Sequence, residues 1–392
     1  MTKKRLIASR IEAIEPFYVM DILARARDLE AQGRSIIHME VGEPDFVTPQ
    51  PIIDAGIAAL NAGQTHYTPA LGLPALRQAV SDFYRDQYGV EISAERIVIT
   101  PGASGALQLA LGALVNPGEH VLMADPGYPC NRHFVQLFDG VPVSLPVGAD
   151  SAYQLTAEMI AANWNEKCKA VLLASPSNPT GTVLDACSLE AIAECVQSKG
   201  GQLIVDEIYH GLVYENDIPS ILQFDQSAMV VNSFSKYFGM TGWRLGWLIA
   251  PEEFIPAIDR LAQNIFLAAS TPAQFAALAA FEPETLKILD QRRDEFKQRR
   301  DYLLPALRGL GFSISAEPQG AFYLYADGSQ FFEDSFQFCQ TLLEKAGVAV
   351  TPGRDFGENK HRQHLRFAYT TSVDKLREGV LRLKTFLDDG NF

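Results

Sequence analysis

The strongest chemical signal in the sequence is the segment Ser233-Phe-Ser-Lys-Tyr-Phe-Gly-Met-Thr-Gly-Trp-Arg, which follows an apolar run at residues 229–232. Within it, Lys236 stands close to the hydroxyls of Ser233 and Ser235 and eight residues before Arg244. A lysine at the end of a strand can form an imine with an aldehyde, while neighbouring hydroxyls and a guanidinium bind a phosphate dianion. A lone lysine is more often an ordinary surface residue, but that interpretation leaves the serines, glycines and arginine unexplained together. The spacing therefore indicates a site for a cofactor that carries both an aldehyde and a phosphate.

Asp206 and Tyr209 follow another predicted strand, at residues 202–205. A carboxylate in that place can pair with a protonated ring nitrogen and so keep an aromatic cofactor electron-accepting. Tyr209 can then reach the phenolate oxygen of the same ring. A strand-end aspartate is, taken alone, more often a cap or a turn former.

A turn of small residues, Pro101-Gly-Ala-Ser, joins a predicted strand at residues 96–100 to a predicted helix at 104–115. Free backbone N–H groups at a helix N-terminus bind anions, and Ser104 adds a hydroxyl. The alternative is the nucleophile elbow of a serine hydrolase, G-x-S-x-G. Here the second glycine, Gly105, directly follows Ser104, one position early. The turn is therefore a candidate for binding phosphate and not for supplying a nucleophile.

Three further residues have two interpretations each. Asn178, in Ser175-Pro-Ser-Asn-Pro-Thr-Gly, can donate to the oxygen that Tyr209 reaches, or can belong to a proline-stiffened loop. Tyr128, after Pro126-Gly, can stack on a planar ring or simply pack in its loop. Arg366 lies in an apolar predicted strand and needs an anion, either a substrate carboxylate or a structural salt-bridge partner.

Short apolar runs alternate with helical patterns from about residue 51 to residue 282. This alternation is typical of a layered α/β domain with a largely parallel sheet, and near-continuous apolar strands fit burial on both faces. The predicted strands span residues 96–100, 120–124, 170–174, 202–205, 229–232 and 245–250, and the predicted helices include 73–88, 104–115 and 189–198.

The pattern changes after Phe281 to a long helix of mixed charge, at about residues 284–310. Beyond it, strands are predicted at 320–326, 348–350 and 365–369, and helices at 332–345 and 373–387, which indicates a smaller α+β unit. A helix near 19–32 and a strand at 36–40 have no obvious core of their own, so we expect them to pack on that unit.

The bulk composition is that of a globular protein: 392 residues, 47% apolar, with a formal charge of −14. This charge disfavours nonspecific binding to nucleic acid or an anionic membrane, so we expect neither as a partner. The five cysteines are scattered, with no C-x-x-C pair, which predicts reduced thiols, a cytoplasmic protein and no metal site. Arg10, Glu12 and Glu15 interrupt the apolar run that a signal peptide needs.

Taken in chain order, these motifs resemble the fold-type I pyridoxal-phosphate-dependent aminotransferases of class I/II. The most specific element is Ser-x-Ser-Lys-x(7)-Arg, supported by Asn-Pro-Thr-Gly and Asp-x-x-Tyr, over a stretch from Glu40 to Arg366. The resemblance implies an aspartate aminotransferase-like α/β fold, in which a mostly parallel seven-stranded sheet lies between helices and both chain ends form a smaller α+β domain. The implied division is 1–48 for an N-terminal segment that packs on the small domain, 49–283 for the large cofactor-binding domain, and 284–392 for the connecting helix and small domain.

The resemblance also implies roles for individual residues. Lys236 would be the catalytic lysine, and Gly42, Asn178 and Arg366 would bind the substrate. Tyr67, in His66-Tyr-Thr, would reach the phosphate of a neighbouring subunit, so that a homodimer shares its active sites. The remaining cofactor-binding positions would be Gly102, Ala103, Ser104, Tyr128, Asn178, Asp206, Tyr209, Ser233, Ser235, Lys236 and Arg244.

The implied activity is transfer of an amino group between an L-amino acid and a 2-oxo acid by a ping-pong mechanism. A carbon–sulfur β-lyase on the same fold is the alternative, and a noncatalytic regulator is another, although related regulators carry a DNA-binding domain for which there is no room before Val41. Tyr128 stands where aspartate-specific enzymes usually have tryptophan, and no second, side-chain-binding arginine is identifiable. Candidates for the walls of the substrate pocket are Phe17, Tyr18, Phe266 and Tyr369.

Overall fold

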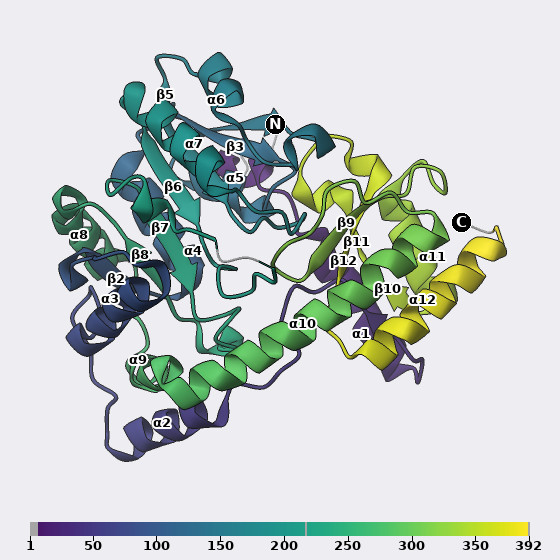
Figure 1. Ribbon diagram of the computed structural model, residues 1–392, viewed down its shortest axis with the longest axis horizontal. Coiled ribbons are helices and arrows are strands. Elements are labelled where there is room, and N and C mark those ends of the chain that lie inside the picture. Colours follow the sequence, from purple (N-terminus) through teal and green to yellow (C-terminus); the bar gives the residue numbers. More distant parts are fainter. Residues whose placement is uncertain (1–6, 216–217, 391–392) are drawn as a thin grey trace, which may run out of the picture.

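A seven-stranded sheet runs through the larger part of the molecule (Figure 1). The structure is a computed structural model, and it describes residues 7–215 and 218–390. The strand order is β2-β8-β7-β6-β5-β3-β4. Strand β8 is antiparallel to both of its neighbours, and the other pairs are parallel. The predicted mostly parallel, seven-stranded sheet is therefore confirmed. Its strands are β2 (Ile97–Thr100), β3 (His120–Asp125), β4 (Val141–Pro146), β5 (Cys168–Ala174), β6 (Gln202–Asp206), β7 (Met229–Ser233) and β8 (Gly246–Ile249).

Helices cover both faces of this sheet, because successive strand residues point to opposite sides. Ile97 and Ile99 join a core that includes α3, α7 and α9, whereas Val98 between them joins a core that includes α4 and α8. The helices of this part are α2 (Gln50–Asn61), α3 (Pro74–Tyr88), α4 (Gly102–Leu114), α5 (Pro129–Leu137), α6 (Ala157–Asn163), α7 (Ala186–Ser198), α8 (Ile255–Ile265) and α9 (Thr271–Leu278).

Strand β4 is the one member of the large sheet that the apolar pattern did not predict. It lies at the sheet's edge, and five of its six residues are at least partly exposed. Pro142 and Pro146 lie within it, and an edge strand tolerates proline because it has an unpaired side. The strand therefore lacks the apolar run that identifies its buried neighbours.

A smaller unit is built around the antiparallel sheet β11-β12-β9, and β1 pairs in parallel with β10 beside it. Ile22, Ala26 and Leu29 of α1 share a core with residues near the end of the chain, including Leu376 and Phe386. Helix α10 passes along the large sheet's helices and reaches this unit (Figure 1). The elements are α1 (Tyr18–Ala31), β1 (Ile37–His38), α10 (Pro283–Leu310), β9 (Tyr323–Asp327), α11 (Ser335–Ala346), β10 (Val348–Ala349), β11 (Thr351–Pro352), β12 (His364–Ala368) and α12 (Val373–Asp388).

A hydrogen-bonded link joins the end of β3 to the smaller unit. The Asp125 carboxylate accepts the backbone N–H groups of Glu358 (3.0 Å) and Asn359 (3.2 Å). Gly357 lies against this carboxylate with φ +150°, and a Cβ at that position would come within 1.8 Å of Asp125 Oδ1. Only glycine permits this approach, so the two parts of the molecule are fixed to each other at this point.

None of the helices within the described ranges is long and apolar enough to cross a membrane.

Candidate active site

A pocket of about 240 Å³ lies where the large sheet's strand ends meet the smaller unit. From the large sheet come the start of α4 and the turns after β3, β5, β6 and β7, and from the smaller unit come the start of α1 and residues of β9 and β12. Most of the residues singled out in the sequence meet here. The candidates that line it are Gly42, Ala103, Ser104, Tyr128, Asn178, Asp206, Tyr209, Ser233, Ser235, Lys236, Arg244 and Arg366.

Lys236 projects from the turn after β7 into this pocket. Its Nζ donates a hydrogen bond to the carbonyl oxygen of Gly42 at 2.7 Å. Burial, the largest effect, and the guanidinium groups of Arg366 and Arg244 together lower the pKa of the amine to about 8, although the charges of Glu43 and Asp206 oppose the shift. An amine with this pKa is partly neutral near pH 7 to 8, so it can attack a carbonyl carbon or accept a proton.

Asp206, the last residue of β6, presents a buried carboxylate to the same pocket. Burial raises its pKa to about 7, although a hydrogen bond from the Ile208 N–H to Oδ1 (3.0 Å) and the charge of Lys236 oppose the shift. A carboxylate that is costly to ionise in its site is stabilised by any cation placed beside it. The position therefore suits a protonated ring nitrogen.

We expect Asp206 to destabilise the cofactor-free protein increasingly as the pH rises from about 5 to 8. The folded pKa is raised above the unfolded value of about 3.9, so the folded state binds more protons in this range and loses stability as the carboxyl ionises. The Asp206→Asn replacement should therefore raise the free energy of unfolding, by on the order of 4 kcal/mol at the upper pH. Thermal unfolding should show the variant's advantage over the parent to be larger at pH 8 than at pH 5. An advantage independent of pH would show that the carboxyl titrates in its ordinary range.

Small residues and hydroxyls form a cradle at the start of α4. A Cβ on Gly102, which has φ +68°, would lie 2.7 Å from Arg244 Nη2, and a Cβ on Gly246 would lie 2.7 Å from the backbone carbon of Gly102. The glycines thus let the guanidinium and the helix N-terminus approach one another. The Ser233 Oγ lies 2.9 Å from the Ser235 Oγ and 3.0 Å from the carbonyl oxygen of Leu245, to which it can donate, so the two serine hydroxyls lie side by side in this cradle. Backbone N–H groups, a hydroxyl and a guanidinium together make a site for a phosphate dianion.

Arg366 is almost completely buried, yet no carboxylate pairs with it among residues 7–215 and 218–390. Its Nη1 donates to Asn178 Oδ1 at 2.9 Å, and its Nη2 donates to the Glu40 carbonyl at 2.5 Å. The Nε has no partner, and the guanidinium stacks 4.3 Å from the ring centre of Tyr323. The structural salt bridge considered from the sequence is therefore not found, and the buried charge is available to an anionic ligand.

Tyr323 is a pocket residue that the sequence did not reveal. Its hydroxyl shares a hydrogen bond of 2.8 Å with that of Tyr209, and a Cβ on Gly42 would collide with it at 1.9 Å. It lies in an apolar run that correctly predicts a strand, but nothing in that run distinguishes a pocket residue from a core residue. The other unpredicted lining residues are Val19, Met20, Val41, Leu107, Ala174, Pro176, Ile208 and Thr241.

The expected wall residues are only partly correct. Phe17 lines the pocket, but Tyr18, Phe266 and Tyr369 do not. The Tyr18 ring packs against Phe336 instead, and the Tyr369 hydroxyl donates to that of Tyr214. Tyr67 also lies outside the lining and is 83% exposed. The sequence does not specify the direction in which the rings of Tyr18, Phe266 and Tyr369 point. Tyr67 was expected at the phosphate of a neighbouring subunit, so its position outside this lining does not test that expectation.

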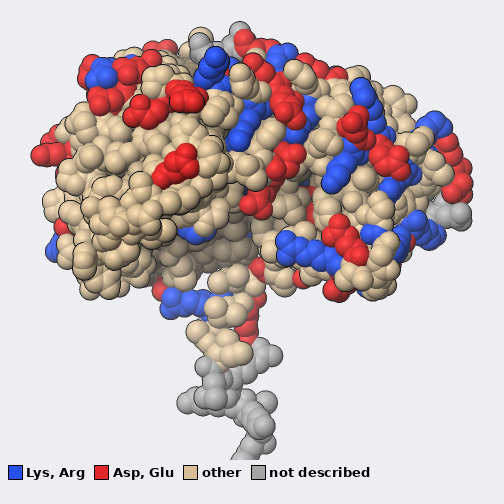
Figure 2. Space-filling model, turned by 90° about the horizontal axis from the view of Figure 1, so that it is seen from below, with Lys and Arg blue, Asp and Glu red and all other residues tan. Residues whose placement is uncertain are grey.

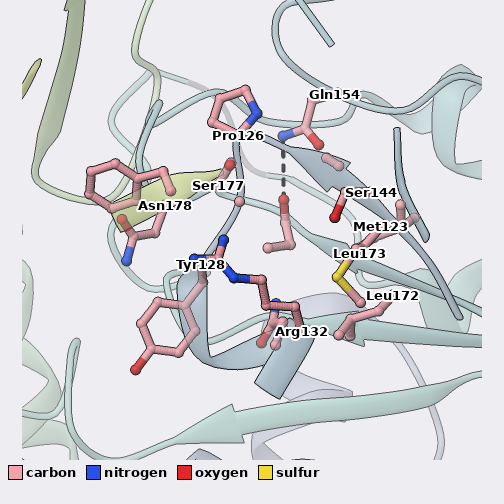
Figure 3. A pocket seen from close by; sticks show the side chains of 15 residues that line it. Met123, Pro126, Tyr128, Arg132, Ser144, Gln154, Leu172, Leu173, Ser177 and Asn178 are labelled. Carbon is pink, nitrogen blue, oxygen red and sulfur yellow. Dashed lines mark hydrogen bonds between the residues drawn. The ribbon is translucent and has the colours of Figure 1, made fainter. Parts of the chain in front are cut away.

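A smaller cavity, of about 30 Å³, adjoins the site (Figure 3). Tyr128 and Asn178 line both spaces, and Arg132 from α5 extends along the smaller one. The Gln154 amide, at its far side, donates to the carbonyl of Ala174 at 3.3 Å.

Comparison with known proteins gives matches over nearly the whole chain. The family model described as aminotransferase class I and II matches residues 34–383. A (5-formylfuran-3-yl)methyl phosphate transaminase of Methanocaldococcus jannaschii is 39% identical, over 98% of this chain and 100% of its own. A valine–pyruvate aminotransferase of Mycobacterium tuberculosis is 38% identical, over 95% of this chain and 97% of its own. The solved structure of Thermus thermophilus aspartate aminotransferase with maleate, 32% identical, has a TM-score of 0.92 and covers 97% of this chain and 100% of its own.

Proposed function

The chain belongs to the class I and II aminotransferase family, and from this premise we propose that it is an aminotransferase that uses pyridoxal phosphate bound at Lys236. The fold is aspartate aminotransferase-like and the activity is amino-group transfer, as the resemblance implied. The observation that carries the cofactor proposal is the meeting of Lys236, Asp206 and Arg366 in one pocket. The amine with its lowered pKa suits imine formation, and the buried carboxylate suits a protonated ring nitrogen. The buried guanidinium, which has no carboxylate partner within the described chain, suits the substrate's α-carboxylate.

The residues present fit this cofactor. We propose that the cradle of Gly102, Ala103, Ser104, Ser233, Ser235 and Arg244 holds the phosphate, while Asp206 pairs with the ring nitrogen. Asn178 and Tyr209 would contact the ring oxygen, and Tyr128 would stack on the ring. Bound pyridoxal phosphate supplies an electron-accepting ring conjugated with the substrate's α-carbon.

The chain's own residues have distinct tasks in the proposed reaction. Arg366, with Gly42 and Asn178 beside it, binds the substrate's α-carboxylate through its guanidinium, which lines the pocket. The Lys236 Nζ, partly neutral because it is buried, takes the proton from the α-carbon. The negative charge of Asp206 would compensate the positive charge of the ring nitrogen in the low-polarity interior. The two half-reactions use the same groups in opposite directions, which gives ping-pong kinetics.

Absorption spectroscopy with a panel of amino acids tests this proposal. The purified protein, supplied with pyridoxal phosphate, should show the visible band of the lysine-bound cofactor. An amino donor should shift that band to the absorption of the cofactor's amino form, and a 2-oxo acid should restore it. Release of pyruvate and ammonia without an acceptor would identify the β-lyase alternative instead. Absence of any band in folded protein would refute the cofactor proposal and favour a noncatalytic role.

We also propose a homodimer whose subunits complete each other's sites. On the side of the molecule where α2 lies, few charged side chains are visible (Figure 2). Val47, Leu60, Tyr67 and Leu267 are each more than half exposed, and α2, which carries Leu60, packs against α9. Thr271 donates to the carbonyl of His66 at 2.6 Å, so the segment with Tyr67 lies beside the start of α9.

All five cysteines have free thiols, which is in keeping with the proposed cytoplasmic location.

A subunit-mixing experiment tests whether Tyr67 acts across that interface. Lys236→Ala and Tyr67→Ala variants should each be impaired as homodimers. When they are unfolded together and refolded, a mixed dimer contains one site with an intact Lys236 and an intact Tyr67 from the other chain. Activity should therefore rise above the mean of the two separately refolded variants. No rise, although mixed dimers form, would place Tyr67 in the same subunit's site or outside any site.

A further inference from the structure

Tyr323 lies between the proposed cofactor site and the proposed site for the substrate's carboxylate. Its side chain is almost completely buried, and it contacts one residue of each site. Its hydroxyl shares a hydrogen bond of 2.8 Å with that of Tyr209, and the centre of its ring lies 4.3 Å from the Arg366 guanidinium. Because the two contacts involve different parts of one side chain, the hydroxyl and the ring can be tested separately.

The antiparallel pairing of β9 with β12 fixes the position of this ring. Arg366 stands opposite Tyr325, so Tyr323 is the diagonal neighbour of Arg366, at a separation that aromatic and long side chains can span. Phe356 also lies beside the guanidinium, with its ring centre at 4.9 Å. Two aromatic rings thus support the buried charge, since the electron-rich face of a ring attracts a cation.

The Tyr323 hydroxyl lies against the backbone of Gly42, where a Cβ would come within 1.9 Å of its oxygen. The Gly42 carbonyl in turn accepts the Lys236 Nζ at 2.7 Å, so the hydroxyl is enclosed by the segment that holds the lysine. Within the described chain, the Tyr209 oxygen is the hydrogen-bonding partner that this hydroxyl has. The hydroxyl is therefore committed to Tyr209.

The surroundings decide which of the two hydroxyls donates. Each has one proton, and in the proposed complex that of Tyr209 is directed to the cofactor's ring oxygen, which leaves the Tyr209 oxygen as an acceptor. Burial raises the pKa of both hydroxyls, that of Tyr209 well above its ordinary value, and the charge of Arg366 opposes the shift in both. Tyr323, whose pKa is raised less, is the more acidic hydroxyl and so the better donor.

We propose that Tyr323 is a positioning residue that connects the carboxylate site with the cofactor site. Its hydroxyl donates to Tyr209 and so holds the Tyr209 proton toward the ring oxygen, while its ring supports the guanidinium of Arg366. The inference rests on the proposed function and adds to it a residue that acts through Tyr209 and Arg366.

A pH titration of the visible band of the cofactor-loaded enzyme tests the hydroxyl. A donor to the ring oxygen stabilises the negative charge of that oxygen, so a weakened donor raises the pH at which the band changes. Tyr323→Phe removes only the hydroxyl and should raise this pH by about 0.5 to 1 unit. Tyr325→Phe is the matched control and should leave the titration unchanged. Tyr325 lies on the same strand, and its buried hydroxyl has no hydrogen-bond partner among the described residues.

A double-mutant cycle distinguishes action through Tyr209 from a general change in the pocket. Tyr209→Phe should raise the titration pH at least as much as Tyr323→Phe, and the double variant should show no further shift. Equal shifts by Tyr323→Phe in the presence and absence of the Tyr209 hydroxyl, or no shift in either case, would overturn the inference but leave the cofactor proposal intact. Absence of the visible band in the loaded parent would instead refute the cofactor proposal.

Binding of 4-methylpentanoate, a carboxylate without an amino group, tests the ring. Followed through the cofactor's absorption, its affinity should stay within about twofold of the parent's in Tyr323→Phe, which keeps the ring, and fall about fivefold or more in Tyr323→Leu. Thermal unfolding shows whether the leucine variant is folded, and the phenylalanine variant and the cycle decide the role of the hydroxyl independently of it. Equal affinities in two folded variants would overturn the proposed support of Arg366.

Discussion

Replacement of Lys236 by alanine is expected to lower kcat by about 10⁴-fold or more, because in the proposed reaction this one side chain serves both as the attachment point and as the proton acceptor. The visible band of the lysine-bound cofactor should disappear, although the cradle and Asp206 still allow pyridoxal phosphate to bind. Addition of methylamine should restore part of the activity, since a small amine can occupy the space that the side chain leaves. Steady-state kinetics and absorption spectra measure both effects.

The control for this variant is Lys199→Ala, at an exposed position after α7. It removes the same charge and should leave kcat, spectrum and cofactor content unchanged. If Lys236→Ala retained more than a tenth of the parent's activity, another group would have to accept the proton. Loss of activity with no rescue and a lowered unfolding temperature would instead indicate a structural role for this lysine.

Replacement of Arg366 by lysine should lower kcat/KM for amino acids by about 100-fold or more, mainly through KM. The substitution keeps the charge but loses the planar array of donors that suits a carboxylate, and it leaves the Glu40 carbonyl and Asn178 without their present partners. The discriminating measurement compares an amino acid with the amine that lacks its carboxylate. The parent should strongly prefer the amino acid, and the variant should lose most of this preference.

Arg377→Lys, at a position whose side chain is 62% exposed on α12, serves as the control. If Arg366→Lys lowered the rates with amino acid and amine by the same factor, the guanidinium would be holding the pocket's shape and not the substrate. A difference confined to the amino acid would support the proposed contact.

The sequence predicted the centre of the site better than its walls, for a physical reason. Lys236 and Asp206 follow buried strands whose apolar runs are easy to recognise, and parallel strands that end at one edge bring such residues together. The family resemblance then correctly predicted the fold and the amino-transfer activity. The roles of the individual residues remain predictions, to be tested by the variants described above.

The walls of the pocket could not be predicted because they depend on contacts between distant parts of the chain. Met20, Val41 and Tyr323 are brought to one pocket only when α1, the segment after β1, and β9 pack together. Their local patterns are those of ordinary core residues, and Tyr18 shows the limit clearly: it neighbours two wall residues but turns its ring to Phe336. Edge strand β4 was missed because its exposure removes the apolar signal.

The link between Asp125 and residues 357–359 limits how the two parts of the molecule can move relative to each other. Because the two parts are joined beside Tyr128, they cannot separate there without losing the hydrogen bonds from Glu358 and Asn359 to Asp125 and the close packing of Gly357. Movement of one part against the other is therefore restricted at this edge of the pocket.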